Sequence, residues 1–414
     1  MKKICMVTYS SYEADNRVRR YAEALVRRGD QVEVVALASD DVSLGSEEIS
    51  GVTAYRIQRR DRNERGKWTY AWRLLRFLIA ASVFLKRRHK HLHYDLIHIH
   101  NMPDFLVFAA WYPKWTGAKL ILDIHDLVPE FFASKFDAPD KGGYIGLLKA
   151  VEKVSARFVD HVIVSNHLWY DKLVARSVPK DKCSVFLNHV DLAIFYRRPR
   201  TRTDEKLVVI FPGSLQWHQG VDIAVKAFAR LKSKIPNAEF HIYSSGGAVQ
   251  AELASLVSSL GLTGSVKFYG SLSLHQIADV IANADLGVVP KRADSFGNEA
   301  YSTKIMEFMS QGVPVVVSRT KVDSFYFDDA VVRFCVSGDD KSMAEAMLEV
   351  VGNKKLRDSL IANGYKYVEQ HSWDSRRGDY LNLVDTLTAG ACADHQRSNC
   401  STTLFEDHLV IEPK

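Results

Sequence analysis

KKICMVTYSSYEADNRVRRYAEALVRRGDQVEVVAL, residues 2–37, contains the strand–helix–strand pattern on which the fold prediction rests. Residues 4–9 form a mainly apolar run that is typical of a buried parallel strand, and residues 32–37 form another. Between them apolar side chains recur at the spacing of one helix face, and Asp15 or Asn16 can cap the start of that helix. The apolar residues of this face are Val18, Tyr21, Ala22, Leu25 and Val26. The stretch therefore predicts a βαβ unit.

Similar units recur on both sides of a polar, basic seam at residues 197–206. Before the seam, the sequences LIHIH, KLILDIH and HVIVS are typical of buried parallel strands. After it, the pattern starts again with LVVIFPGS and a helix, followed by strands in AEFHIYSSGG, VKFYGS, DLGVVP and VPVVVS. Two successive α/β halves predict two Rossmann-like, doubly wound domains that face each other across a cleft. Ligands are then expected at the carboxyl ends of the strands.

Length and composition indicate a globular protein. The 414 residues exceed one ordinary core, and contents of 47% apolar and 25% charged residues are typical of folded chains. Five cysteines without metal-like spacing favour a reducing compartment. The first residues predict a strand rather than a signal peptide, and no apolar stretch reaches the ~20 residues that span a bilayer. We therefore expect a cytoplasmic protein.

The net charge of +6 is concentrated in residues 56–90, where twelve Lys or Arg accompany only Asp61 and Glu64. This local balance of +10 leaves −4 for the rest of the chain. Aromatic and aliphatic residues lie between the basic clusters 59–62 and 86–90, a composition typical of a helix at a lipid interface. The segment predicts reversible docking on an anionic membrane surface; the alternative is an ordinary core helix with solvated basic ends. Because no nucleic-acid-binding module surrounds it, we expect no nucleic-acid partner.

The run DSFGNEAYSTKIMEFMSQGVPVVVS, residues 294–318, contains two glutamates eight residues apart. Glu307 falls in the first half of a predicted helix, residues 303–311, where its carboxylate can accept both hydroxyls of a nucleotide ribose. The helix amino terminus offers N–H groups to a diphosphate, and Lys304 adds a cation. Glu299, in the preceding loop, can reach the hydroxyls of a sugar beyond that diphosphate. The alternative is a pair of solvated glutamates on a helix surface.

This run resembles the E-x7-E signature of the large retaining glycosyltransferase family that includes glycogen synthase-like and mannosyl-type enzymes, called family 4 or glycosyl transferases group 1. Further matches occur in order along about residues 1–388. They are the opening KKICMVTYSS with RVRRYAEALVRRGDQVEVVAL, then YDLIHIHN, VFLNHVDLAIF, VKFYGSLSLHQIADVIANADLGVVP and HSWDSRRGDYLNL. The chain is thus similar to this family over most of its length.

The resemblance implies a GT-B fold, with an acceptor-side domain at residues 1–200 and a nucleotide-sugar-binding domain at residues 205–370. A closing helix at residues 371–388 is then expected to pack back on the first domain. Residues 389–414, which lack clear periodicity, are expected to form a loosely ordered tail. The resemblance also implies transfer with retention at the anomeric carbon, and neither a metal ion nor a cofactor.

The resemblance also assigns roles to individual side chains. Glu307 would bind the ribose and Glu299 the donor sugar, while His125 in LDIHDLVPE would face the sugar from across the cleft as a catalytic residue. The alternative for His125 is a buried histidine that satisfies a turn. Asp126 and Glu130 are candidates to orient His125 or to bind acceptor hydroxyls.

One departure from the family pattern concerns the donor diphosphate. The family's G-R-L turn and its following K-G supply two cations, whereas this chain reads GSLQWHQG from Gly213, with Ser214 and Gln219 in their places. A diphosphate still requires positive charge, because charge develops on it as the leaving group departs. The substitutes that we expect are Lys291, Arg292 and Lys304, with His218 as a weaker candidate.

These observations predict a retaining glycosyltransferase that moves a hexosyl unit from a UDP- or GDP-sugar to a saccharide or lipid-linked acceptor. A role in the biosynthesis of cell-surface polysaccharide or glycolipid is expected, with the protein cytoplasmic or peripheral on the inner face of the cell membrane. Two alternatives remain open: a sugar-nucleotide epimerase of the same fold, and a non-catalytic nucleotide-binding paralogue that acts as a partner subunit. The first keeps the fold and changes the chemistry, and the second is suggested by the missing Arg and Lys.

Overall fold

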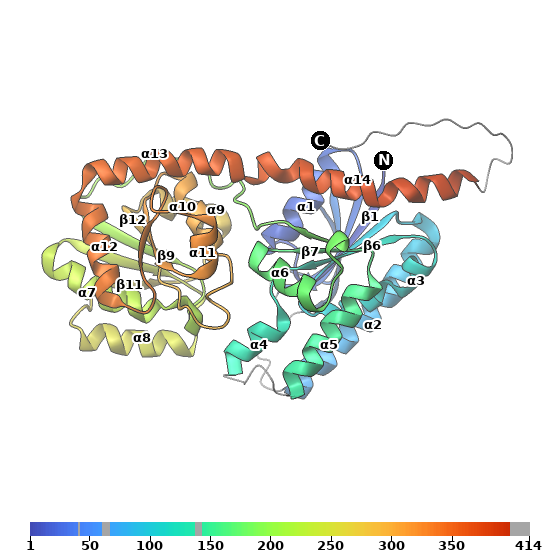
Figure 1. Ribbon diagram of the computed structural model, residues 1–414, viewed down its shortest axis with the longest axis horizontal. Coiled ribbons are helices and arrows are strands. Elements are labelled where there is room, and N and C mark those ends of the chain that lie inside the picture. Colours follow the sequence, from blue (N-terminus) through green and yellow to red (C-terminus); the bar gives the residue numbers. More distant parts are fainter. Residues whose placement is uncertain (40–41, 60–66, 137–142, 398–414) are drawn as a thin grey trace.

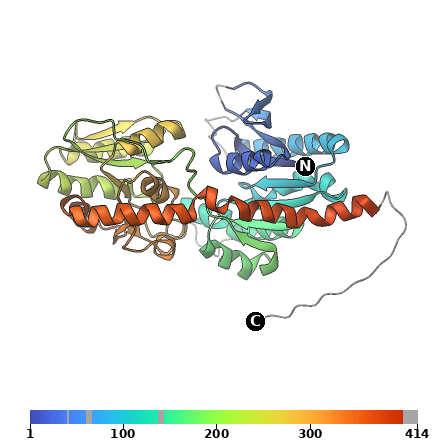
Figure 2. The same cartoon turned by 90° about the horizontal axis from the view of Figure 1, so that it is seen from above.

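The computed structural model describes residues 1–39, 42–59, 67–136 and 143–397. It contains two α/β domains, each built on a mainly or wholly parallel sheet, with helices α13 and α14 running along both of them (Figure 1). Figure 2 shows the same two helices from above as a continuous track that spans the two domains. The predicted architecture of two doubly wound domains is confirmed.

The amino-terminal domain has an eight-stranded sheet with the order β3-β4-β2-β1-β5-β6-β7-β8, in which only β3 pairs antiparallel. The strands are β1 (Lys3–Ser11), β2 (Gln31–Ala38), β3 (Gly45–Ile49), β4 (Val52–Arg59), β5 (Leu96–His100), β6 (Lys119–Ile124), β7 (His161–Val164) and β8 (Cys183–Val185). The helices are α1 (Asn16–Arg27), α2 (Lys67–Leu92), α3 (Trp111–Trp115), α4 (Val128–Phe136), α5 (Gly143–Phe158) and α6 (His167–Arg176), with 3₁₀ turns η1 (Asp104–Ala110) and η2 (Lys180–Lys182).

Helix α1 forms where the periodicity of the sequence places it. Asp15 is its N-cap, and the side chain accepts a hydrogen bond from the Val18 amide. Gly29 lies just past the helix end with φ +96°, a backbone conformation that favours glycine. The buried face packs on β1 and β2, so the predicted βαβ unit is confirmed.

The carboxy-terminal domain has a six-stranded, wholly parallel sheet with the order β11-β10-β9-β12-β13-β14. Its strands are β9 (Leu207–Pro212), β10 (Ala238–Tyr243), β11 (Val266–Tyr269), β12 (Leu286–Val289), β13 (Val315–Arg319) and β14 (Arg333–Val336). Its helices are the 3₁₀ turn η3 (Trp217–Gln219), α7 (Val221–Lys234), α8 (Ala248–Ser259), α9 (Leu274–Ala282), α10 (Thr303–Ser310), α11 (Lys321–Tyr326), α12 (Asp340–Gly352) and α13 (Lys354–His371).

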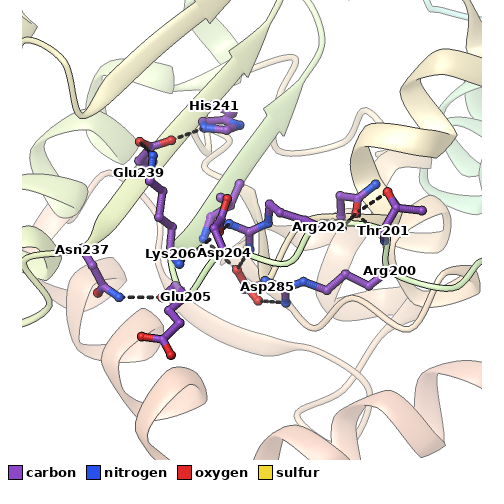
Figure 3. A network of polar contacts seen from close by, with 12 residues as sticks. Arg200, Thr201, Arg202, Asp204, Glu205, Lys206, Asn237, Glu239, His241 and Asp285 are labelled. Carbon is purple, nitrogen blue, oxygen red and sulfur yellow. Dashed lines mark hydrogen bonds and ion pairs between the residues drawn. The ribbon is translucent and has the colours of Figure 1, made fainter.

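The basic seam between the domains is fixed to the carboxy-terminal sheet. Arg200 and Arg202 both pair with Asp285, which precedes β12 (Figure 3). Lys206 pairs with Glu239 of β10 at 2.7 Å, and His241 contacts the same carboxylate at 2.9 Å. These contacts lie at the amino ends of the strands, the edge opposite to the one where parallel sheets bind ligands.

The chain crosses between the domains twice, and the two crossings contact each other. The first precedes the seam, and the second is the junction between α13 and α14 (Trp373–Arg397). His189 Nδ1 donates to the His371 carbonyl at 2.5 Å, and the Trp373 amide donates to the Val190 carbonyl at 2.9 Å. Helix α14 packs on the amino-terminal domain, as predicted for residues 371–388, and its helix extends to Arg397. The expectation of a loosely ordered tail at residues 389–414 stays a prediction: α14 continues to Arg397, and residues 398–414 lie outside the described chain.

Helix α2 occupies most of the basic segment 56–90. One of its faces packs into the core through Leu74, Phe77, Ala81 and Leu85. The opposite face exposes four large apolar residues, which are Trp72, Leu75, Ile79 and Val83. Within the described parts of the chain, no helix has the length and apolar character needed to cross a bilayer.

Several cations of this segment are used inside the protein, which corrects part of the charge analysis. Arg56, in β4, is buried and pairs with Glu13 and Glu47. Arg88 pairs with Glu33. Of the predicted cluster 59–62, only Arg59 belongs to the described residues. The segment thus contributes fewer free charges than its composition suggests.

Candidate active site

A cavity of about 390 Å³ lies between the domains and is lined by residues from both. The amino-terminal domain contributes the ends of β1 and β6 and the start of α1, including Ser10, Asp15 and His125. The carboxy-terminal domain contributes Thr303 and Glu307 from α10. The cavity therefore lies at the carboxyl ends of the strands, where a ligand was expected.

His125 directly follows β6 and is held from behind by a buried polar network. Its Nε2 lies 3.3 Å from the Asp123 carboxylate and 3.1 Å from His100 Nδ1. Asp123 is fully buried and accepts two hydrogen bonds, each 2.8 Å long, from the Arg17 guanidinium. The network holds one ring nitrogen of His125, and the residue also lines the cavity.

The electrostatics of this network follow from burial and from Arg17. Burial alone would raise the pKa of Asp123, but the adjacent Arg17 outweighs it and holds that pKa well below its usual range. Burial lowers the pKa of His98 and of His100, so both imidazoles are neutral at pH 7. The carboxylate is therefore ionised, with Arg17 as its main counter-charge.

Neither candidate partner of His125 takes the orienting role that the sequence suggested. Glu130 lies in a separate ion-pair cluster with Arg176, which also pairs with Glu152. The Asp126 carbonyl accepts from Asn101, and its side chain lines a neighbouring cavity. Asp123 holds the histidine instead, because it lies two residues earlier on the same buried strand end.

The part of the site that the sequence predicted to bind the donor is built on α10 and the loop after β9. Gly213, Ser214, Lys304 and Glu307 line a second cavity of about 320 Å³, and Glu307 also lines the cleft cavity. The backbone of Gly213 passes directly beneath Lys304: a Cβ at this position would lie 2.6 Å from Lys304 Cε. These four predicted donor-site residues are thus close together in the structure.

Lys304 and Glu307 of this cavity are half-buried. Burial lowers the pKa of Lys304 to about 8, and its ammonium donates to Gln219 Oε1 at 2.8 Å. Burial raises the pKa of Glu307, a shift that the positive charge of Lys304 opposes. A bound diphosphate would give Lys304 the negative partner that its site otherwise supplies only weakly.

Lys291 and Arg292 do not reach this cavity, which corrects the sequence-based choice of cations. Lys291 is buried and pairs with Asp323 at 2.8 Å, and it also donates to the Ala300 carbonyl at 2.6 Å. Arg292 stacks on Trp217, with its guanidinium carbon 3.5 Å from the ring centroid, and pairs with Asp222. Both side chains support loops around the site.

His218 is also unsuited to neutralise a phosphate. Burial lowers its pKa to about 4, so the imidazole is uncharged at pH 7. Its ring contacts Phe296, with a centroid separation of 5.1 Å. Lys304 is therefore the cation that remains, among the described candidates, at the cavity that holds Glu307.

Glu299 lies at the domain interface and contacts the opposite domain. Its carboxylate pairs with Lys172 of α6 at 2.6 Å, and its backbone carbonyl accepts from Asn166 Nδ2 at 3.1 Å. Neither partner was singled out in the sequence. Lys172 is one of many surface-type lysines along the chain, and nothing local distinguishes it.

Two family descriptions match the chain, one on each domain. The glycosyl transferase 4-like domain matches residues 14–189, and glycosyl transferases group 1 matches residues 194–367. The chain is a group 1 glycosyltransferase. The resemblance inferred from the E-x7-E run is confirmed, and so is the GT-B fold.

The similarity to individual proteins also extends over most of this glycosyltransferase. A D-inositol 3-phosphate glycosyltransferase of Actinosynnema mirum is 26% identical over 374 residues, which cover 85% of this chain and 87% of that one. Sucrose-phosphate synthase from Thermosynechococcus elongatus has a TM-score of 0.77 at 20% identity, over 94% of this chain and all of that one. Anabaena HepE, solved with UDP and glucose, has a TM-score of 0.67 at 16% identity, over 96% and 100%.

Sequence reasoning missed the buried ion pair of Arg17 and Asp123 that lies behind His125 in this glycosyltransferase. Arg17 is almost fully buried, lines the cleft cavity, and has no hydrogen-bond partner at Nη1 among the residues described. The two residues are 106 positions apart, so no spacing in the sequence connects them. A buried aspartate inside an apolar strand, as in LILDI, is the signal that could have drawn attention to the pair.

One group with the composition of a metal site occurs in the part of the glycosyltransferase that the structure describes. It consists of His98, His100 and Asp123, all fully buried. Arg17 already neutralises the Asp123 carboxylate with two hydrogen bonds, and His98 Nδ1 contacts the Tyr380 hydroxyl at 2.9 Å. The chemistry of this group fits a structural hydrogen-bond network better than a cation.

Proposed function

We propose that this glycosyltransferase moves a hexosyl unit from a UDP- or GDP-sugar to a saccharide or lipid-linked acceptor, with retention and without a metal ion. One observation carries the proposal: His125 of one domain and Glu307 of the other line the same cleft cavity. On the donor side, Glu307, Lys304 and the amino terminus of α10 together match a ribose and a diphosphate. Anabaena HepE, which shares the fold, is solved with UDP and glucose.

The proposed chemistry uses few protein groups. The bond between the anomeric carbon and the diphosphate oxygen breaks, and an acceptor oxygen bonds that carbon on the same face. The acceptor proton passes to the departing diphosphate. Lys304 and the free N–H groups of α10 stabilise the charge on the leaving group, a role that a metal ion serves in other enzymes.

The catalytic assignments to His125 and Glu299 are part of the same proposal. His125, held by Asp123, would contact the donor sugar from the acceptor side. Glu299 would bind sugar hydroxyls, which requires that it exchange its contact with Lys172 for the sugar. A partly exposed ion pair of this kind contributes only ~0.2–1 kcal/mol, so the exchange is energetically accessible.

A panel of UDP-, GDP-, ADP- and CMP-sugars tests the proposal. A ligand at 100 times its Kd adds about 2.7 kcal/mol to the folded state, so the true donor raises the melting temperature. NMR of the product then reports whether the anomeric configuration is retained, and full activity in EDTA is expected. If a sugar nucleotide raises the melting temperature but none is turned over, the non-catalytic nucleotide-binding alternative replaces this proposal, and if none raises it, both are refuted.

We further propose that α2 docks the protein on an anionic membrane. The exposed apolar residues of α2 are flanked by Arg76, Arg87 and Lys90, which are exposed and therefore available to lipid phosphates. Flotation with phosphatidylserine-containing vesicles tests this. Binding should weaken at high salt and in Trp72→Ser/Ile79→Ser, and a wild-type protein that stays in the soluble fraction at low salt refutes it.

A further inference from the structure

An apolar groove of about 660 Å³ runs between α2, α4, α5 and the 3₁₀ turn η1. Its volume is within the range of small-molecule sites. The walls are formed mainly by side chains such as Leu74, Phe105, Val128, Ile145 and Leu148. In Figure 1 the two helices α4 and α5 lie at the lower edge of the amino-terminal domain, and both α2 and α5 contact η1.

A third cavity of about 400 Å³ lies between the groove and the cleft and shares lining residues with each of them. This middle cavity shares Tyr70 and Met102 with the apolar groove, and Asp15 and His125 with the cleft cavity. Its remaining lining is largely polar and includes Asn101. From the cleft outward, the lining of these neighbouring cavities is therefore first polar and then apolar.

We propose that the acceptor is a membrane lipid whose hydrocarbon chain lies in the apolar groove and whose polar head lies in the middle cavity. This inference rests on the proposed function and names its acceptor class. The order of the cavities matches an amphiphile, since the head group places its hydroxyl beside His125 while the chain extends away from the cleft. A simple saccharide would leave the apolar groove unused.

The surroundings of the groove favour a lipid over a second copy of the chain. Tyr144 and Leu147, exposed on α5, lie at its edge, and Trp72 and Leu75 are exposed on the neighbouring turns of α2. An aromatic and aliphatic rim of this kind suits the boundary between head groups and acyl chains. An interface with another copy of the chain would explain the apolar groove, but it would not explain the middle cavity that adjoins both the groove and the cleft.

Calorimetry with hexyl, octyl and decyl glucosides, each below its micelle concentration, tests the proposal on the full chain. A buried chain gains affinity with each methylene, by about fourfold if every group leaves water. Ala71→Trp, at an exposed α2 position that lines the groove, should fill the groove and so remove the dependence of affinity on chain length. Ala150→Trp introduces the same side chain at an exposed α5 position outside the groove and should leave the chain-length dependence intact. Leu147→Glu, at the groove edge, is a second variant, and it should weaken the dependence of affinity on chain length.

The outcomes separate the inference from the proposed function. Chain-length dependence that Ala71→Trp abolishes and Ala150→Trp preserves supports the groove. Affinity independent of chain length, or unchanged in Ala71→Trp, overturns it, and so does a dimer in sedimentation that Ala71→Trp dissociates. Titration of the same samples with UDP and with GDP tests the donor site alone: failure of both titrations with an intact alkyl series would refute the proposed function and leave the apolar chain site standing.

Discussion

Replacing Lys304 by Met should make the ligand-free protein more stable and the donor site weaker. In the ligand-free protein the ammonium is half-buried above Gly213, and its one close acceptor is the neutral Gln219 Oε1 at 2.8 Å. Its aliphatic stem contacts Phe211, whose ring centroid lies 5.1 Å from Nζ. Met retains the stem and removes the charge.

The size of the effect follows from the pKa. A fall from 10.5 to about 8 means that the folded state disfavours the charged form by about 3 kcal/mol. The lost hydrogen bond to Gln219 offsets about 1 kcal/mol of this. Lys304→Met should therefore raise the free energy of unfolding at pH 7 by about 2 kcal/mol. It should weaken UDP binding by roughly 10- to 100-fold, because a charge-assisted contact with the diphosphate is lost.

The pH dependence identifies the cause. Below pH 8 Lys304 is charged in both the folded and the unfolded state, so the buried charge destabilises the folded wild type by its full amount. Between pH 8 and about 10.5 only the unfolded state retains the proton, so the wild type gains stability and the difference from the variant narrows. Urea unfolding of both proteins from pH 7 to pH 10.5 measures this difference.

A matched control is Lys226→Met, at an exposed position of α7, which should change stability by less than ~0.5 kcal/mol at every pH. The reasoning is refuted if Lys304→Met is less stable than the wild type at pH 7. A difference that does not vary with pH, or an unchanged UDP affinity by calorimetry, would refute it equally.

Three further predictions concern the rest of the site. Glu307→Ala should weaken UDP binding by a few kcal/mol, because the ribose hydroxyls lose their acceptor, while circular dichroism shows a folded protein; unchanged UDP affinity contradicts this. Asp123→Asn should lower the free energy of unfolding by about 3–5 kcal/mol, because Arg17 is left buried without its counter-charge; a loss below ~1 kcal/mol in urea unfolding speaks against it. Lys172→Met should tighten binding of the donor sugar nucleotide up to about fivefold and leave UDP unaffected, since it frees Glu299; equal effects on both ligands would show that the ion pair does not compete with the sugar.

Local patterns predicted the elements that rely on local interactions. The face of α1 and the strands β1, β2 and β5 follow directly from apolar periodicity. Strand β4 was missed because its buried face includes the polar residues Arg56 and Gln58, which break the apolar alternation that indicates a strand. Arg56 looks like a surface cation in the sequence, yet the strand turns it inward toward Glu13 and Glu47.

The candidate site shows the same limit. Lys304 and Glu307 are three positions apart on one helix, so their shared cavity could be predicted from spacing. Lys291 is near them in sequence, but its direction is set by Asp323, which lies in α11 and has no sequence signal that connects it. Long-range pairs of this kind depend on how the domains pack, which no short motif contains.

The place of α14 has a consequence for synthesis of the chain. Tyr380 and Val384 are fully buried in the amino-terminal domain, where the Tyr380 ring packs against Tyr21 at a tilt, with centroids 4.2 Å apart. Asp385 also pairs with Lys2 at 2.8 Å, joining the two ends of the described chain. The domain that leaves the ribosome first therefore completes its core last, after the carboxy-terminal domain has been made in full. A chain truncated before residue 373 and released from the ribosome would contain one finished domain, and it would be the second.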